Sequence, residues 1–162
     1  MSAFDRLPLE RRKAILDGLM VRKRRYISAL NREPLKAKVI IVGDRPGPAA
    51  PTDPNYHHTP FYSIKHCSGW LNTLLQERGI SENDLLWLNA ADRLGNPTDP
   101  RILKDNVSLL GLHIISLGGN AQRWLAKDCK QGSEMIYHPQ YWKRFRNKEP
   151  YPLIDRLAEI TA

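Results

Sequence analysis

Short apolar runs, rich in β-branched residues, recur along the chain between stretches of helical periodicity. Residues 38–42, 85–88 and 113–117 form three such runs, and residues 134–137 form a weaker fourth. Continuous apolar runs of this length are typical of strands buried on both faces, as in a parallel sheet. The pattern therefore predicts four short strands.

Apolar residues repeat at helical spacing before, between and after these runs. The predicted helices cover residues 9–30, 68–78, 101–110, 120–127 and 152–161, with Gly79 as the stop of the second. Short buried strands that alternate with helices predict an α/β fold. We expect a three-layer α/β/α sandwich around a mostly parallel central sheet of about four strands.

Length and composition narrow the class of protein. The chain of 162 residues suits one domain, and 41% of it is apolar. No apolar run approaches the roughly 20 residues of a membrane span, and charges interrupt the N-terminus where a signal peptide would be apolar. Two cysteines, Cys67 and Cys129, cannot alone make a structural zinc site or an iron–sulfur cluster. We expect a cytoplasmic monomer with reduced thiols and neither metal nor cofactor.

The charge is uneven along the chain. Residues 1–36 hold 10 basic and 4 acidic residues, residues 37–139 hold 10 of each, and residues 140–162 hold 5 and 3. This pattern predicts a basic N-terminal helical arm over residues 1–36, packed on a single domain of residues 37–162. Such asymmetry favours a polyanionic partner, most simply nucleic acid. The plainer alternative is a solvated basic surface that aids solubility.

Polar residues follow each predicted strand. Asp44, Asn89 and His138 come just after three of the apolar runs, and Gly118-Gly119-Asn120 follows the run of residues 113–117. Ligands of open parallel sheets bind at the carboxyl ends of the strands, so Asp44, Asn89 and His138 are candidates for one site. Each also has a plainer role, such as a turn hydrogen bond, a cap or a surface position.

Five short motifs link these positions. They are Gly43-Asp44-Arg45-Pro46-Gly47; Pro60-Phe61 with Ser68-Gly69; Leu86-Trp87-Leu88-Asn89; Leu117-Gly118-Gly119-Asn120-Ala121; and Tyr137-His138-Pro139. In this order they resemble the uracil-DNA glycosylase superfamily, and most closely the branch that usually carries an iron–sulfur cluster. The resemblance covers roughly two-thirds of the chain, from residue 38 to about residue 145.

The resemblance implies a fold of the glycosylase type and a role for each motif. Asp44 would position the attacking water or stabilise the cationic sugar, and His138 would stabilise negative charge on the leaving base. Asn89 would read the imide edge of uracil, and Phe61 would stack on the flipped base, with core packing as its plainer role. The loop residues that would line the base pocket are Gly43, Arg45, Pro46 and Gly47.

The chain departs from the pattern of that branch at four points. The cysteines that ligate the cluster are missing, so no cluster is expected. Asp44 stands in place of Glu, Arg45 replaces a small residue, and Gln140 follows His-Pro where Ser is usual. Arg45 adds a positive charge at the rim of the pocket.

The segment after His138 interleaves aromatic and basic residues. Aromatic rings can stack on bases or wedge into a base step, while cations contact phosphates. An amphipathic surface turn is the plainer interpretation. The predicted DNA contacts are Tyr141, Trp142, Lys143 and Arg144, followed by Phe145, Arg146 and Lys148, with Ser68, Gly118 and Asn120 added by the family motifs.

Together these features lead us to expect a monofunctional DNA glycosylase that flips out uracil or a related modified pyrimidine and hydrolyses its N-glycosidic bond. One alternative is an enzyme of the same fold that processes a hypermodified pyrimidine in DNA. Another is a DNA-binding protein that has lost catalysis. A hydrolase of small nucleotides is weaker, because it would not explain the basic segments. A viral and a bacterial source both suit a small, basic, cluster-free chain.

Overall fold

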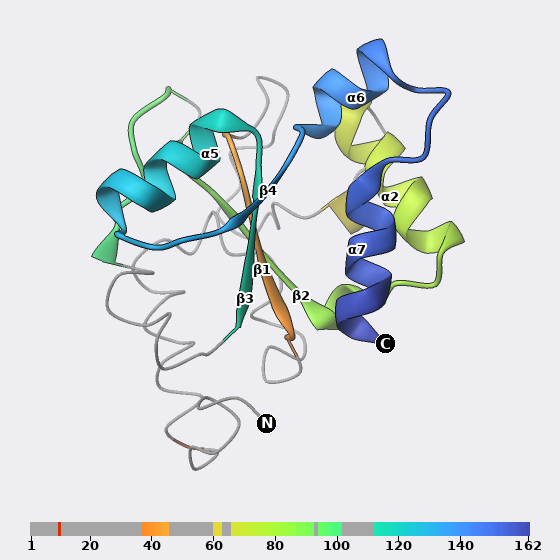
Figure 1. The fold of residues 1–162 in the computed structure, drawn as a ribbon, viewed down its shortest axis with the longest axis horizontal. Helices are drawn as coiled ribbons and strands as arrows, with labels where there is room; N and C mark the ends of the chain where they lie inside the picture. The colour runs from red at the N-terminus through yellow and green to blue at the C-terminus, as the bar shows by residue number, and fades with distance from the viewer. Residues whose placement is uncertain (1–9, 11–36, 46–59, 63–65, 93, 102–111) are drawn as a thin grey trace.

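The computed structural model describes residues 10, 37–45, 60–62, 66–92, 94–101 and 112–162. Its centre is a four-stranded sheet in which every strand pairing is parallel (Figure 1). The spatial order of the strands is β2-β1-β3-β4. The strands are β1 (Val39–Gly43), β2 (Leu85–Asn89), β3 (His113–Leu117) and β4 (Glu134–Ile136).

The apolar strand β1 is buried on both faces. Val39 and Ile41 face one layer of helices, and Ile40 and Val42 point to the other side; all four are fully buried. This is the environment that the apolar run predicted, because alternate side chains of a strand point to opposite faces.

Register aligns the carboxyl ends of the strands. Gly43 of β1 pairs with Asn89 of β2, and Leu117 of β3 pairs with Ile136 of β4. The residues that follow all four strands therefore emerge along the same edge of the sheet.

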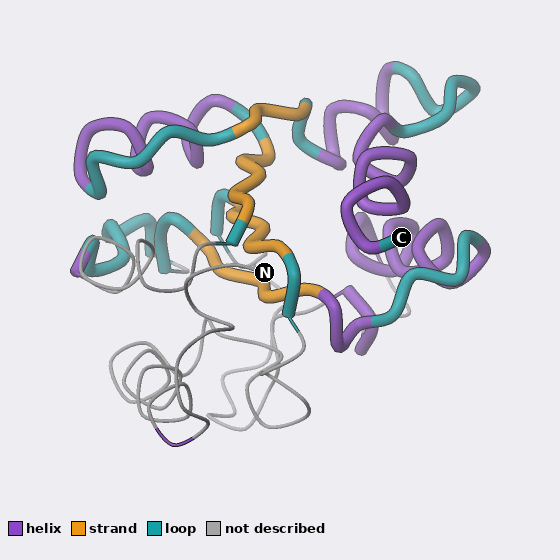
Figure 2. The backbone as a smooth tube through the Cα atoms, turned by 60° about the horizontal axis from the view of Figure 1, so that its bottom comes forward, coloured by secondary structure: helices purple, strands orange, loops and turns teal. Residues whose placement is uncertain are grey.

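Helices lie on both sides of the sheet (Figures 1 and 2). One side carries α2, α6 and α7, and the other carries α5, which continues into a π-helical turn, η5. Two short 3-10 turns, η3 and η4, precede α2 and β2. The bounds are η3 (Pro60–Tyr62), α2 (His66–Glu77), η4 (Glu82–Asp84), α5 (Gly119–Arg123), η5 (Trp124–Asp128), α6 (Pro139–Phe145) and α7 (Pro152–Thr161).

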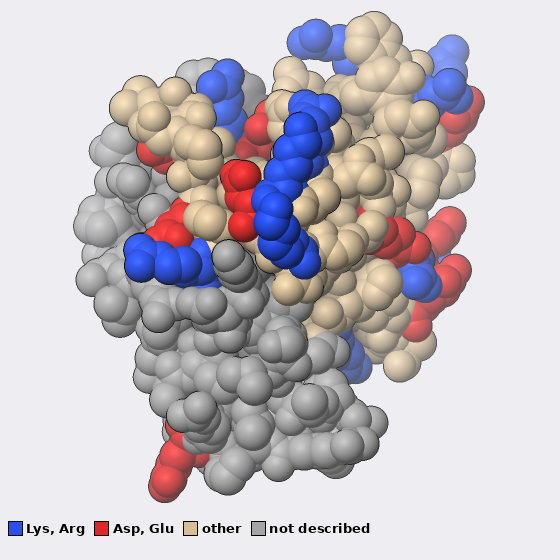
Figure 3. All heavy atoms as spheres, turned by 60° about the vertical axis from the view of Figure 1, so that its left-hand side comes forward, with Lys and Arg blue, Asp and Glu red and all other residues tan. Residues whose placement is uncertain are grey.

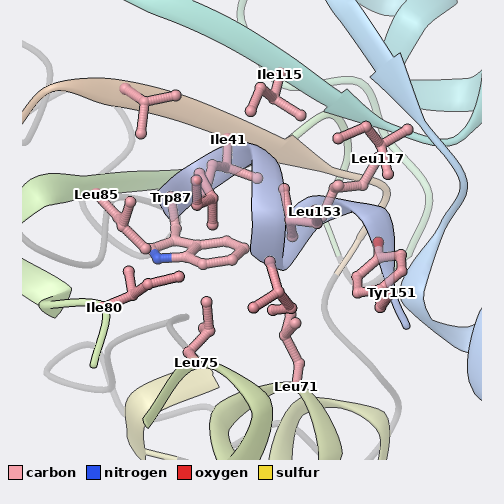
Figure 4. Close-up of a cluster of buried hydrophobic side chains, with 14 of the residues drawn as sticks. Ile41, Leu71, Leu75, Ile80, Leu85, Trp87, Ile115, Leu117, Tyr151 and Leu153 are labelled. Carbon is pink, nitrogen blue, oxygen red and sulfur yellow. The ribbon is translucent and has the colours of Figure 1, made fainter. Parts of the chain in front are cut away.

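The main core cluster fills the space between the sheet and α2 and α7 (Figure 4). Trp87 of β2 lies among Leu75, Ile80 and Leu85, and Leu153 of α7 belongs to the same cluster. Each fully buried aliphatic side chain of this kind stabilises the fold by about 1.5–3 kcal/mol. The indole Nε1 of Trp87 is buried and has no hydrogen-bond partner among the described residues.

Local capping explains where two helices begin and end. Beyond α2, Gly79 N–H donates to the Gln76 carbonyl at 3.0 Å and Ile80 N–H donates to the Leu75 carbonyl at 3.0 Å. This is the Schellman arrangement, and Gly79 has the positive φ of 74° that it needs. Pro152 is in the first turn of α7, where the absent N–H costs nothing.

The α/β class, the parallel sheet and its four strands are confirmed. Helices over 68–78, 120–127 and 152–161 are also confirmed, although the second turns π-helical at Trp124. The predicted arm over 1–36, apart from helical, exposed Glu10, and the helix 101–110, apart from Arg101, lie outside the described residues. Helix α6 was not predicted from the sequence.

Within the described part of the chain, no helix combines the length and the apolar character that crossing a bilayer requires.

Candidate functional site

The strand order has a switch point between β1 and β3. Strand β2 follows β1 along the chain and lies on one side of it, whereas β3 comes later and lies on the other side of β1. Open parallel sheets bind their ligands at such a switch point, outside the carboxyl ends of the strands. Asp44 follows β1 and Asn120 follows β3, and Asn120 Nδ2 donates to Asp44 Oδ2 at 3.3 Å. The fold thus joins two predicted site residues that are 76 positions apart.

A third side chain fixes the amide of Asn120. The Arg123 guanidinium donates to Asn120 Oδ1, which orients the Nδ2 group toward Asp44. Arg123 also lies over Gly119, because a Cβ at Gly119 would be 3.1 Å from Arg123 Nη1. Sequence reasoning missed Arg123, although its position three residues after Asn120 on a helix was a usable signal.

Asn89 lies next to the end of β1. A Cβ built on Gly43 would be 3.0 Å from Asn89 Oδ1, so the glycine makes room for the amide. Ala90 N–H donates to the Gly43 carbonyl at 2.9 Å, and Ala91 N–H donates to the Asp44 carbonyl at 2.9 Å. These backbone bonds hold the exits of β1 and β2 together beyond the sheet.

The backbone of Asn89 is also tied to the following loop. Thr98, which is buried, donates from Oγ1 to the Asn89 carbonyl at 2.7 Å. The Thr98 carbonyl in turn accepts from Trp124 Nε1 at 3.0 Å. The end of β2 is therefore linked to the helical layer that carries Asn120, which limits how far the two amides can move apart.

His138 lies at the end of β4 and caps α6. Its Nδ1 accepts from Gln140 N–H at 3.0 Å, and Pro139 occupies the first turn of the helix. Because Nδ1 is the acceptor, the neutral imidazole carries its proton on Nε2. Burial lowers the pKa of His138 below its usual value, although the nearby charge of Asp44 raises it. The neutral donor form is thus favoured near neutral pH.

Gly118 makes room for His138. Its φ of 92° and ψ of 174° lie in a region that is essentially confined to glycine. A Cβ there would be 3.2 Å from His138 Cβ. Gly118 N–H donates to the Ile136 carbonyl at 2.8 Å, which ties the end of β3 to the end of β4.

Arg45 extends from β1 toward the loop after β2. It is exposed, and its Nη1 lies 3.4 Å from the position that a Cβ on Gly95 would take. The loop is shaped by Asp92, whose Oδ1 accepts from Leu94 N–H and Asn96 N–H, both at 2.9 Å. A tight turn thus lies beside the guanidinium, at the rim of the candidate site.

Other predicted residues have different surroundings. Phe61 of η3 is half-buried and packs against the main core cluster, and Ser68 is exposed on α2. Pro46 and Gly47 lie outside the described residues.

The aromatic and basic segment divides into two faces. Tyr141, Lys143 and Arg144 are exposed on α6. Trp142 is only 7% exposed, and its Nε1 donates to the Glu149 carbonyl at 3.0 Å. We therefore correct the prediction for Trp142, because its ring is packed in the core and is not offered to DNA. Tyr137, which was not among the predicted contacts, is exposed beside Tyr141.

Neither metal ligands nor cysteine pairs are gathered in the described residues. No group of three or more His, Cys, Asp or Glu side chains there could hold a metal ion. Cys67 and Cys129, the two cysteines of the chain, are not joined in a disulfide. Burial raises the pKa of the Cys67 thiol, and the charge of Lys143 opposes this.

Comparison of the chain with models of known protein families, and with curated proteins, gave no match.

Proposed function

We propose that this protein is a DNA glycosylase that removes uracil or a related modified pyrimidine from DNA by hydrolysis. One observation carries the proposal: Asn89 ends β2, Asp44, Asn120 and His138 come after β1, β3 and β4, and the four strands end at the same edge of a parallel sheet. Asp44 and Asn120 are hydrogen-bonded across the switch point between β1 and β3. The order of motifs along the chain adds to this, since it resembles that of the glycosylase superfamily.

The proposed reaction is the attack of water on C1′ of the deoxyribose. The N-glycosidic bond breaks, and its electron pair leaves with the base as an anion. Asp44, held by Asn120, would orient the water, accept its proton and stabilise the positive charge that develops on the sugar. The products are the free base and an abasic site.

His138 is suited to the developing charge on the base. Its Nδ1 is occupied by the Gln140 N–H, so Nε2–H is the donor that it can offer to an oxygen of the leaving pyrimidine. A neutral donor stabilises the anion by a hydrogen bond without first being deprotonated. Lowering of the pKa of His138 by burial favours that neutral form.

Asn89 is suited to base selection. Its amide offers one donor and one acceptor, which matches the imide edge of uracil and mismatches that of cytosine. The absence of a side chain at Gly43 leaves room for Asn89 Oδ1, which a Cβ at that position would approach to 3.0 Å. A site with a fixed amide can reject the wrong base through unpaired polar groups.

The test is strand cleavage by alkali after incubation with labelled oligonucleotides. Each carries one uracil, hydroxymethyluracil or mismatched thymine, in single- and double-stranded form. We expect an abasic site at uracil, and a loss of at least about 100-fold in rate for Asn89→Ala and His138→Ala, within the range of a removed charge-stabilising donor. His113→Gln is the matched control, because this exposed histidine pairs with Glu134 away from the site.

Absence of cleavage on every one of these oligonucleotides would overturn the proposal in this form. Cleavage confined to DNA that carries a larger modified pyrimidine would instead favour an enzyme that processes hypermodified pyrimidines, in which the exposed Arg45 contacts the modification.

A further inference from the structure

Three aromatic side chains line one face of the segment that contains α6. Tyr137, Tyr141 and Phe145 follow one another at intervals of four residues and are 55%, 39% and 67% exposed. The ring centroids of Tyr137 and Tyr141 are 5.2 Å apart, and those of Tyr141 and Phe145 are 5.4 Å apart. The three rings, which we call the aromatic strip, are therefore in contact and open to solvent.

The opposite face of α6 holds the strip in place. Pro139 and Trp142 are buried, and the Trp142 ring packs 5.9 Å from that of Tyr151. The Tyr151 hydroxyl donates to the Tyr137 carbonyl at 2.6 Å, which ties the start of the strip to α7. The fold has thus buried one aromatic face of this segment and left a second one exposed. Packing of α6 accounts for Trp142 but not for the strip.

Basic residues are interspersed with the strip along the sequence. Residues 139–148 contain Lys143, Arg144, Arg146 and Lys148 and no acidic residue. Lys143, Arg144 and Lys148 are exposed. Arg146 lies over the Trp142 ring at 5.8 Å and pairs with Glu149 at 3.3 Å, so it is partly engaged within the protein. Exposed aromatic rings among cations suit a partner that has both flat apolar faces and negative charge.

We propose that the aromatic strip is a binding site for single-stranded nucleic acid, on which unpaired bases stack while Lys143 and Arg144 contact the backbone. A duplex keeps the faces of its bases hidden, whereas a single strand exposes them. Tyr137 and Tyr141 stack on one another, so bases would contact the ring surfaces of the strip that stay exposed to solvent. This inference rests on the proposed function only for the location of the binding site. Tyr137 directly precedes His138, so the bound nucleotides would flank the reacting base.

The test measures binding of an undamaged oligothymidylate of about 12 nucleotides, within the known range of single-strand sites. Fluorescence anisotropy compares it with a duplex of the same length. The variant Tyr141→Leu/Phe145→Leu keeps apolar side chains with good helix propensity but lacks the flat rings. We expect it to bind the single strand roughly 10-fold more weakly or worse, with little change for the duplex.

Two control variants separate stacking from charge and from general apolar contact. Leu94→Ala removes an exposed apolar side chain, 85% accessible, that is outside the strip, and should bind as the unmodified protein does. Lys143→Gln/Arg144→Gln should weaken the binding of both nucleic acids and make that binding less dependent on salt, because the variant removes phosphate contacts and leaves the rings in place. Far-ultraviolet circular dichroism checks that each variant is folded.

Unchanged single-strand binding by Tyr141→Leu/Phe145→Leu overturns the proposal. Sedimentation velocity tests a second copy of the chain as the occupant. If the protein self-associates, and the variant loses this self-association but still binds the single strand, the strip is a contact between copies of the chain. That result would also overturn the proposal. The oligothymidylate contains no uracil, so a loss of stacking and a failure of the glycosylase proposal are observed in separate assays.

Discussion

His138 combines two functions that depend on the same nitrogen. Nδ1 accepts the Gln140 N–H that caps α6, and this bond also fixes the proton on Nε2. Protonation of Nδ1 would remove the cap and add a charge in a half-buried position. The local chemistry therefore links the start of α6 to the protonation state of the candidate catalytic histidine.

Because burial lowers the pKa of His138 below 6.5, the unfolded chain takes up this proton at a higher pH than the folded chain does. The stability that this group contributes is present above about pH 6.5, its ordinary value, and is lost as the pH falls through the lower folded value. We expect the free energy of unfolding to fall from about pH 7.5 to about pH 5.5. Urea denaturation across this range measures it.

The matched variant for this prediction is His138→Asn. Asparagine is a good N-cap and does not titrate, so the variant keeps the cap and removes the proton. It should show a flatter dependence on pH than the unmodified protein. Equal slopes in the two proteins would contradict the assignment of this pH dependence to His138.

A second prediction at the residue scale concerns the effect of replacing Gly118. Gly118→Ala should lower the free energy of unfolding by about 1–3 kcal/mol, because its backbone conformation is nearly exclusive to glycine and its Cβ would press on His138. Gly79→Ala is the control, since Gly79 also has a positive φ, of 74°, but has no atom within 4 Å of the added Cβ. Both variants are expected to lose stability, and only Gly118→Ala should also lose glycosylase activity. Equal activity losses would show that the contact with His138 is unimportant.

At the scale of elements, α6 buries Pro139 and Trp142 and exposes its other residues. Trp142 is buried against Tyr151, whereas the adjacent Tyr141 points to solvent. Trp142→Ala should lower the free energy of unfolding by about 3–5 kcal/mol, as for other buried aromatic residues. Tyr141→Ala should lower it by only about 0.5–1 kcal/mol, because an exposed ring loses its contacts within the strip and a solvent-exposed hydrogen bond with Arg146.

Chemical denaturation of the two variants checks this difference. A similar loss for both would mean that α6 is anchored through its outer face, and it would also weaken the proposal that the aromatic strip is available to a ligand.

Sheet and helices were predictable to different degrees. The β1, β2 and β3 runs have apolar side chains on both faces of the strand. This pattern is typical of strands buried inside a parallel sheet. Helix α6 has a Pro at its start, seven residues and five aromatic or basic side chains in succession, so its short pattern has no clear period. Its helical state depends on the His138 cap and on burial of Trp142 by other elements.

At the scale of the whole molecule, the net charge of +8 is concentrated in the sequence at residues 1–36. On the side of α5, the described Lys and Arg residues lie beside Asp and Glu, so that face carries mixed charge (Figure 3). Long-range attraction to a polyanion is therefore expected from the terminal segments more than from the face of α5.

Binding to DNA should weaken as salt rises, with a slope of about −0.9 in log K against log salt for each phosphate contacted in a duplex. Replacing Arg22, Lys23, Arg24 and Arg25 together by Gln should make this slope shallower. Lys127→Gln, in the mixed-charge region after α5, should leave it unchanged. Affinity that is equal at low and high salt would contradict the nucleic-acid expectation altogether.

The candidate site was predictable where it depends on position along a strand. Asp44, Asn89 and His138 follow apolar runs, and parallel register brings such positions to one edge. The partners of these residues were not predictable in the same way. The hydrogen bond of Asn120 to Asp44, and the room that Gly118 leaves for His138, arise between segments whose distance depends on the whole fold.

The sequence by itself determined the α/β class, the strands and the polar residues that follow them, because local patterns of apolar and polar residues fix which segments can be buried and on how many faces. Only the tertiary structure decided that Trp142 is buried while Tyr137, Tyr141 and Phe145 form an exposed strip, and that Asn120 reaches Asp44. The reason is physical: neighbouring residues of one short aromatic and basic segment are equally able to face the core or the solvent. Which face is covered depends on α7 and Tyr151, and these come later in the chain.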